Sequence, residues 1–221
     1  MTSRLKITTK NVRDYFFLEK LTPEKSSLLF KCEEYNDYLF HDAIRSLKDH
    51  IAKTWLLCEH KTGKIAAYMS LIMDAIKLSM TEKELHGLNY PFKTIPAMKI
   101  AKLAVDGGFS ERYKGIGSFM INAAIGKAFD CNEDYCAARF VTVDADIEHD
   151  KGVLTFYEKN GFIPNDELHN KNRKTMKTPR NRSRGVFVGE EIYNTGGVFT
   201  PPSNQHEKRP VPVKKNLAVY A

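Results

Sequence analysis

A short glycine-bearing turn, RYKGIGS from Arg112 to Ser118, carries the residues best suited to bind phosphate. It follows a strand-like run and precedes a helix-like run, so several unpaired backbone N–H groups would point one way. Such a cluster attracts phosphate oxygens, and the helix dipole adds about 0.3 to 1 kcal/mol per favourable charge. Gly115 and Gly117 would let the oxygens reach the backbone, and Lys114 adds positive charge. A purely structural turn is the alternative, since neither the Walker loop nor the dinucleotide fingerprint is present.

The segments before this turn are expected to form strands. Residues 15–20 are an apolar-aromatic run typical of a strand. Residues 53–59 and 65–78 flank HKTGK, whose glycine permits a positive φ, and so predict an antiparallel hairpin. Residues 97–105 form the next strand, in which apolar residues and lysines alternate imperfectly, as in a bulged strand.

Helices are expected between these strands and the later ones. A hydroxyl, a proline and an acid at residues 22–24 predict a helix start, and helical spacing continues to Ile51. Residues 138–146 favour a strand and residues 151–160 a short amphipathic helix. A strand follows directly, and residues 173–178 favour a last one. This order predicts an α/β protein with a mixed sheet and helices on its faces.

Composition excludes several classes of protein. The chain has 221 residues, of which 42% are hydrophobic and 28% charged, so it can bury a core. Its longest nearly apolar stretch, residues 65–73, is half as long as a membrane-spanning helix. No secretory signal is visible, so a cytoplasmic location is expected. The four cysteines form no C-x-x-C pair, which predicts reduced, mostly buried thiols and neither a metal site nor a disulfide framework: Cys32, Cys58, Cys131 and Cys136.

The net charge of +7 belongs to the C-terminal segment. Residues 169–221 hold 11 Lys and Arg against 3 Asp and Glu, together with five of the nine prolines. Such a composition cannot offset the entropy cost of ordering the chain. We therefore expect a folded domain at residues 1–178 and a basic, disordered tail at residues 179–221. The tail would either bind RNA phosphates or serve as a solubilising extension.

Two motifs and their spacing resemble the GNAT superfamily of acetyl-CoA-dependent N-acetyltransferases. KLAVD followed by RYKGIG is similar to the strand and the R/Q-x-x-G-x-G/A pyrophosphate loop of that family. FYEKNGF, residues 156–162, is similar to the helix and turn after the fifth strand, with Tyr157 where a catalytic tyrosine is usual. The resemblance covers roughly residues 5–178. Five residues separate Asp106 from Arg112, where about three are common, which predicts a bulge or longer loop before the turn.

The resemblance implies a mostly antiparallel central sheet with splayed middle strands, helices on both faces, and an acetyl-CoA site without a metal. The backbone of three strand residues would bind the pantetheine arm: Leu103, Ala104 and Val105. The turn would hold the pyrophosphate through seven residues: Arg112, Tyr113, Lys114, Gly115, Ile116, Gly117 and Ser118. Asp150 stands where an asparagine is common, and is included among the cofactor-binding residues.

A finer resemblance is to the toxin-type branch, whose members acetylate the amine of aminoacyl-tRNA. Residues 30–43, FKCEEYNDYLFHDA, are similar to the N-terminal motif of that branch, although Glu33 stands where glycine is usual. This resemblance implies tRNA as a partner, and an antitoxin and a homodimer as further candidates. The body outside the tail is close to neutral, so a tRNA surface would need the tail or a local basic patch.

Acetyl transfer needs a neutral amine to attack a thioester and a thiolate to leave. The leaving thiol has an ordinary pKa near 8.5, so a positioned acid helps it leave. We expect the Tyr157 phenol to donate that proton, which is worth on the order of 10² to 10⁴ in rate. An ordinary half-buried tyrosine is the alternative. A backbone N–H near Val105 is the expected donor to the oxyanion.

The sequence selects no general base. Near a strand end lie Asp144, Asp146, Glu148 and His149, but for each of them taken singly a solvated acidic turn is the favoured interpretation. A lysine ε-amine, with a pKa of about 10.4, needs strong assistance to lose a proton, whereas an α-amine at about 7.7 to 8.0 needs little. An α-amine is therefore the better acceptor if no base is present. A small amine or polyamine, a protein amine, or a non-catalytic acetyl-CoA-binding role are the alternatives.

Overall fold

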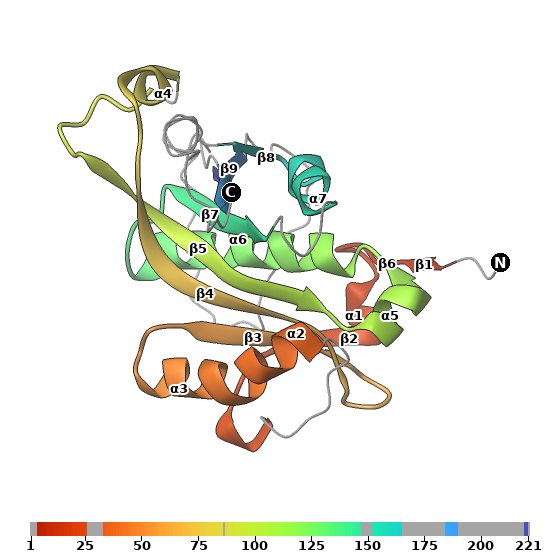
Figure 1. Ribbon diagram of the computed structural model, residues 1–221. Coiled ribbons are helices and arrows are strands. Elements are labelled where there is room, and N and C mark those ends of the chain that lie inside the picture. The colour runs from red at the N-terminus through yellow and green to blue at the C-terminus, as the bar shows by residue number, and fades with distance from the viewer. Residues whose placement is uncertain are drawn as a thin grey trace, which may run out of the picture.

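The computed structural model of the chain describes residues 4–25, 33–85, 87–146, 152–164, 184–189 and 219–220. Within these residues the chain forms a mixed α/β fold around one large sheet (Figure 1). The strands of the sheet have the spatial order β10-β8-β9-β7-β5-β4-β3-β2. The first five in chain order are β2 (Phe16–Lys20), β3 (Lys53–Glu59), β4 (Ile65–Lys77), β5 (Thr94–Val105) and β7 (Phe140–Asp146). The last three are β8 (Phe162–Pro164), β9 (Arg184–Gly189) and β10 (Val219–Tyr220).

The strands from β2 to β5 pair antiparallel, and β5 pairs with β7 in parallel. The predicted hairpin is confirmed, because β3 and β4 pair from Lys53 opposite Leu71 to Cys58 opposite Ile65. The predicted bulge in β5 is also present: the register against β4 shifts between Ile100 and Lys102.

The middle strands β5 and β7 separate part of the way along the sheet. They pair only from Ala97 opposite Phe140 to Ile100 opposite Val143. Beyond that point β5 continues to Val105 beside β4, while the end of β7 pairs with β9 on its other edge. This is the splay that the resemblance to the GNAT superfamily implied.

Helices cover both faces of the sheet, as expected (Figure 1). The 19-residue helix α6 (Ile116–Asp134) packs on one face through the main hydrophobic cluster, which includes Met69 and Ile100. The other face is covered by α2 (Glu33–Asp37), the π-helical turn η2 (Tyr38–Asp42) and α3 (Ala43–Lys48), through a second cluster around Tyr68. Successive side chains of β4 point to opposite faces of the sheet, so this strand contributes to a separate hydrophobic core on each face.

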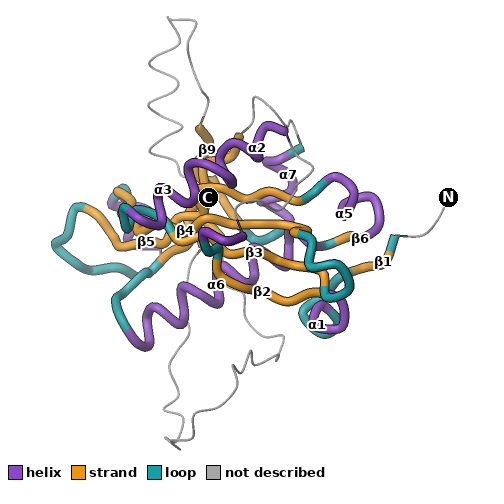
Figure 2. Tube along the Cα trace, turned by 90° about the horizontal axis from the view of Figure 1, so that it is seen from below, coloured by secondary structure: helices purple, strands orange, loops and turns teal. Residues whose placement is uncertain are grey.

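Shorter elements complete the fold. A two-residue parallel pair joins β1 (Leu5–Lys6) to β6 (Tyr113–Lys114), and Figure 2 shows the two side by side. The remaining helices are α1 (Val12–Tyr15), η1 (Pro23–Lys25), α4 (Met80–Leu85), α5 (Gly107–Arg112) and α7 (Val153–Lys159).

Two predictions about local structure were wrong in detail. The helix expected from residue 22 to Ile51 differs in type and in its end: it starts as the 3₁₀ turn η1, it includes the π-helical turn η2 within the continuous run from Glu33 to Lys48, and it ends three residues before Ile51. Residues 26–32, between η1 and α2, lie outside the described chain. The bulge or longer loop expected after Asp106 is the helix α5. Asp106 caps this helix by accepting a hydrogen bond from the Phe109 amide, and Phe109 is buried. Burial of one aromatic side chain thus overrides the two glycines that favoured a loop.

The tail is described only at β9 and β10. Both strands lie beyond residue 178 and pair with the sheet, β9 with β7 and β8, and β10 with β8 and β9. The strand expected at residues 173–178 lies outside the described residues. The division at residue 178 stays a prediction.

Candidate functional site

The glycine turn of the sequence forms the N-terminus of α6. Gly115 precedes the helix with a φ of +89°, and its carbonyl accepts the first helical bond, from Phe119, at 2.9 Å. The next amides, those of Ile116, Gly117 and Ser118, precede any intrahelical acceptor. Within the described chain, no carbonyl or side chain accepts a hydrogen bond from them. They form the anion-attracting cluster that the sequence predicted.

Gly115 is required for packing against the N-terminal strand. A Cβ at this position would lie 2.6 Å from the carbonyl oxygen of Ile7. The chain is held there because the Ile7 amide donates to the Lys114 carbonyl at 2.7 Å, extending the β1–β6 pair. The glycine therefore serves close backbone approach and a left-handed conformation, whereas the sequence suggested a path for phosphate oxygens.

Gly117 is the point where three predicted segments meet. A Cβ here would lie 3.0 Å from Cζ of Phe156 in α7 and 3.8 Å from Cγ2 of Val105 at the end of β5. The strand, the turn and the tyrosine-bearing helix, which lie far apart in sequence, thus converge at one glycine. Phe156 forms a wall beside the first turn of α6.

The open edge of β5 presents backbone groups where the strands separate. The Asp106 amide bonds to the Ala66 carbonyl of β4 at 2.9 Å, and Ala104 lies opposite Tyr68. Because backbone groups alternate between the two edges of a strand, those of Leu103 and Val105 face away from β4. Ala104, expected to contact a cofactor, instead directs its backbone groups to β4.

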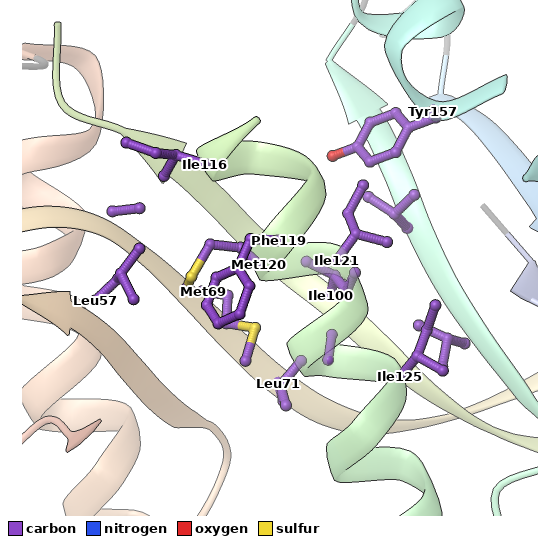
Figure 3. Packing of buried hydrophobic residues seen from close by; sticks show 14 of the residues in the cluster. Leu57, Met69, Leu71, Ile100, Ile116, Phe119, Met120, Ile121, Ile125 and Tyr157 are labelled. Carbon is purple, nitrogen blue, oxygen red and sulfur yellow. The ribbon is translucent and has the colours of Figure 1, made fainter. Parts of the chain in front are cut away.

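Tyr157 lies inside the main cluster, with a 5% exposed side chain. Its ring packs between Phe156 and Phe162, at centroid distances of 5.2 and 5.4 Å. Figure 3 shows the ring projecting from α7, with its oxygen turned toward the side of the cluster where Ile116 lies. Burial raises the pKa of Tyr157 well above its ordinary value, and the phenol of Tyr35 adds to the shift. The hydroxyl therefore stays protonated at neutral pH.

Arg112 and Tyr113 are engaged with a residue that sequence reasoning missed. Glu59, at the end of β3, is 5% exposed and accepts hydrogen bonds from Arg112 Nη1 at 3.3 Å, the Tyr113 hydroxyl at 3.4 Å and Thr62 at 2.7 Å. The Arg112 guanidinium also lies over the Phe109 ring, 4.3 Å from its centroid. The two side chains thus anchor the turn to the β3–β4 hairpin. No local motif marks Glu59, because Arg112 and Tyr113 lie 53 and 54 residues away from it in sequence.

A second group missed by sequence reasoning lies on the opposite face of the sheet. Lys102 Nζ lies 5.6 Å from the ring centroid of Tyr35 and 5.8 Å from that of Tyr38. The Tyr68 hydroxyl donates to the Tyr35 carbonyl at 3.0 Å and fixes this part of α2. Tyr35 acts on the pKa of Tyr157, so the two faces approach each other where the strands separate. The motif at residues 30–43 contained this signal.

The remaining predicted site residues fall into three groups: those exposed or half-buried at the turn, those held in β7, and those outside the described chain. Lys114 is exposed beside the turn, and Ser118 is half-buried in it. Asp144, a candidate base, forms an ion pair with Lys99 at 2.7 Å. Asp146 ends β7. Three candidates lie outside the described residues: Glu148, His149 and Asp150.

Among residues with described positions, no three His, Cys, Asp or Glu side chains gather as a metal site would require. None of the helices in that part of the chain has the length and apolarity to cross a bilayer. The cysteines differ from expectation: Cys58 is buried, whereas Cys131 is half-buried and Cys136 exposed.

The sheet, its splay and the helix order define the GNAT fold, as the structural comparisons show. No family model and no curated protein sequence matches the chain. The structure of AtaT complexed with acetyl-methionyl-tRNAfMet matches with a TM-score of 0.57 and 18% identity, covering 78% of this chain and 93% of that one.

Two further structures match similarly. AtaTR bound with acetyl-CoA has a TM-score of 0.54 and 20% identity, covering 68% of this chain and 87% of that one. A tyrosine-to-phenylalanine mutant of KacT has a TM-score of 0.56 and 16% identity, covering 67% and 87%. The fold predicted from the sequence is thereby confirmed.

Proposed function

We propose that this protein is an acetyl-CoA-dependent N-acetyltransferase whose acceptor is the α-amine of an aminoacyl-tRNA, and that it acts as a toxin in the cytoplasm. The observation that carries the proposal is the convergence at Gly117. There the end of β5, the free amides of α6 and the tyrosine-bearing helix α7 come together beside the strand splay. The shared fold with AtaT, complexed with acetyl-methionyl-tRNAfMet, supports the choice of acceptor.

The backbone groups fit the coenzyme. Its pyrophosphate would be bound by the amides of Ile116, Gly117 and Ser118, with Lys114 as the neighbouring cation. Its pantetheine amides would pair with the backbone of Leu103 and Val105, on the edge of β5 that β7 leaves open. Acetyl-CoA, once bound, supplies an activated acyl thioester and a thiolate leaving group.

The side chains supply less chemistry than the backbone. Tyr157 Oη would donate the proton that the departing thiolate needs, and its raised pKa keeps that proton in place until then. The N–H of Val105 would bind the developing oxyanion. Arg112 and Tyr113 would act by holding the turn through Glu59, because their hydrogen bonds go to that carboxylate.

An α-amine suits a site with little base catalysis. The Asp144 carboxylate is engaged in an ion pair with Lys99 at 2.7 Å, so it is not held in readiness for an acceptor amine. An amine with a pKa of about 7.7 to 8.0 is substantially neutral at physiological pH, unlike a lysine ε-amine. Aminoacyl esters carry such an amine.

Partners and boundaries complete the proposal. AtaT has been solved with the C-terminus of the antitoxin AtaR, and KacTA with DNA. By analogy, a protein antitoxin would inhibit this chain, and a homodimer is a further candidate assembly. The catalytic domain would occupy residues 1–178, and the basic tail would add RNA contacts.

Incubating the full-length protein with acetyl-CoA and separate pools of aminoacyl-tRNA, N-terminal peptides, lysine peptides and polyamines tests the proposal. Mass spectrometry should find acetylation of the aminoacyl-tRNA α-amine first. Acetylation of polyamines alone would show that the acceptor is a polyamine and not an aminoacyl-tRNA. Binding of acetyl-CoA without acetylation of any acceptor would show that the protein is a binding protein and not an enzyme.

The role of Tyr157 has a matched test. The variant Tyr157→Phe keeps the packing against Phe156 and Phe162 and loses only the hydroxyl, so kcat should fall by about 10² to 10⁴ while KM for acetyl-CoA changes little. Tyr135→Phe, at a site that is 85% exposed, is the control and should behave as wild type. An unchanged kcat in Tyr157→Phe would end the proton-donor role.

A further inference from the structure

Two cysteines lie side by side at the C-terminal end of α6. Cys131 is in the last turn, and its carbonyl accepts hydrogen bonds from the Tyr135 amide at 2.9 Å and the Cys136 amide at 2.8 Å. This reversal of the chain brings Cys136 back over the helix. The two Sγ atoms lie 3.0 Å apart, so forming a bond between them needs little movement of the backbone.

The surrounding chain holds this arrangement. The side chain of Asn132 bonds to both the amide and the carbonyl of Ala138, which fixes the connection from α6 to β7 just beyond Cys136. Cys136 is exposed and Cys131 half-buried, so small reagents in solvent can reach the pair. Cys58 has the opposite character: it is fully buried, and burial with a hydrogen bond to Glu19 raises its pKa to about 12.

We propose that Cys131 and Cys136 are an oxidisable dithiol, a modification site that low-molecular-weight disulfides such as oxidised glutathione convert into an intramolecular disulfide. The site does not depend on the acetyltransferase proposal, since it lies at the other end of α6 from the phosphate turn. Cys131 is 14 residues from Gly117, which is about 21 Å along a helix.

The reaction balances in two exchanges. The Cys136 thiolate attacks one sulfur of glutathione disulfide, the S–S bond breaks, and one glutathione leaves as a thiolate that takes up a proton. The Cys131 thiolate then attacks the Cys136 sulfur of the mixed disulfide, and the second glutathione leaves in the same way. The protein loses two electrons and two protons, and glutathione disulfide gains both.

The order of attack follows from the environment. Cys136 is the exposed sulfur and meets the reagent first. Burial and the hydrogen bond with Cys136 raise the pKa of Cys131, so its thiolate is scarcer until the neighbouring sulfur has reacted. Once the mixed disulfide forms, Cys131 attacks a sulfur already beside it.

Tryptic mapping of the full-length protein after incubation with oxidised glutathione gives a direct test. Cleavage after Lys127 and Arg139 leaves both cysteines in one peptide, residues 128–139, whereas Cys32 and Cys58 fall in two other peptides. We expect peptide 128–139 to lose two hydrogen atoms and to resist alkylation until dithiothreitol is added. The two other cysteine peptides should alkylate fully after denaturation.

Single variants separate the steps. Cys131→Ser should stop at a stable glutathione adduct on Cys136, and Cys136→Ser should react much more slowly. The oxidised wild type should melt a few degrees higher than the reduced form, because the bond closes a short loop of the unfolded chain, and KM for acetyl-CoA should not change. A persistent glutathione adduct on the wild type, a disulfide-linked dimer, or no reaction would each overturn the proposal.

Discussion

At the scale of single residues, the two glycines of the turn have different roles. Gly115 has a left-handed φ and touches backbone, whereas Gly117 touches the end of a side-chain ring. The sequence pattern treats them as equivalent. Their surroundings indicate that Gly115 allows the close backbone contact with Ile7, whereas Gly117 sets the spacing between α6 and α7.

Replacing each glycine by alanine should separate these roles. Gly115→Ala should lower the free energy of unfolding by at least about 1 to 2 kcal/mol, the cost of a left-handed alanine, with more from the contact with Ile7. Gly117→Ala should cost less stability, since the Phe156 ring can move, but should raise KM for acetyl-CoA. Urea denaturation and steady-state kinetics measure both.

Gly126→Ala is the matched control for both variants. It lies in α6 with nothing within 4 Å of a new Cβ. This substitution should therefore stabilise the protein by about 0.5 to 1 kcal/mol through helix propensity alone. A Gly115→Ala protein as stable as Gly126→Ala would contradict the described backbone contact.

A double-mutant cycle on Glu59 and Arg112 tests whether Arg112 acts through the carboxylate. Glu59→Gln and Arg112→Gln should each raise KM for acetyl-CoA, and the double variant should be no worse than the worse single one. The coupling in stability should be only about 0.2 to 1 kcal/mol, because the guanidinium side chain is 53% exposed. If the increases in KM of the two single variants multiply in the double variant, Arg112 is instead an independent phosphate ligand.

At the scale of elements, the β1–β6 pair is the least conspicuous part of the site. It has two residues on each side, yet it holds the turn from which the free amides project. Deleting residues 1–6 should raise KM for acetyl-CoA several-fold and leave kcat nearly unchanged, because the turn loosens while Tyr157 stays packed in α7. Isothermal titration with coenzyme A provides the binding measurement, and a fall in kcat alone would contradict this role.

Much of the element order was predictable, and the failures have physical causes. The hairpin of β3 and β4 and the splay of β5 follow from alternation, turn residues and a motif. The helix expected up to Ile51 fails because periodicity does not reveal where a helix widens into η2. The helix α5 was not predicted because Gly107 and Gly108 disfavour a helix. The Asp106 cap and the burial of Phe109 stabilise it despite these glycines.

The site itself was only partly predictable. Local motifs led to the turn and to Tyr157, because each motif consists of residues close together in sequence; their roles stay predictions. Glu59 could not be predicted, because its partners come from another part of the chain. The direction of the Ala104 backbone groups, toward β4, could not be predicted, because it depends on the register with β4, which the sequence does not reveal.

At the scale of the whole molecule, the pH dependence of kcat/KM should indicate the pKa of the acceptor amine. For an α-amine acceptor, kcat/KM should rise through about pH 8 and then level off. Tyr157 should cause no decline below about pH 10, because burial raises the pKa of its phenol above the ordinary value. Rate measurements from pH 6 to 10 should give the same rising limb in Tyr157→Phe. A limb centred near the ε-amine pKa of about 10.4 would indicate a lysine acceptor instead.

The tail offers a second prediction at this scale. Of the eleven basic residues in residues 169–221, seven lie at residues 171–184, before β9 or at its start, whereas residues 190–221 hold four basic and three acidic ones. Deleting residues 190–221 should therefore leave RNA affinity and its salt slope nearly unchanged. Deleting residues 179–221 should reduce both, because three arginines are lost, and should also lower stability by removing β9 from the sheet. If both deletion variants bind RNA with the same affinity and that affinity does not depend on salt, the tail has no role in RNA recognition.

For the toxin activity proposed above, the convergence at Gly117 also bears on the point in translation at which the chain could become active. Its three contributors, the end of β5, the start of α6 and Phe156 of α7, emerge from the ribosome in that order, and the last lies two thirds of the way along the message. A nascent or prematurely terminated chain that stops before α7 has the turn proposed to bind the coenzyme but lacks Tyr157, its proposed proton donor. Truncated products of this gene should therefore be harmless when expressed alone.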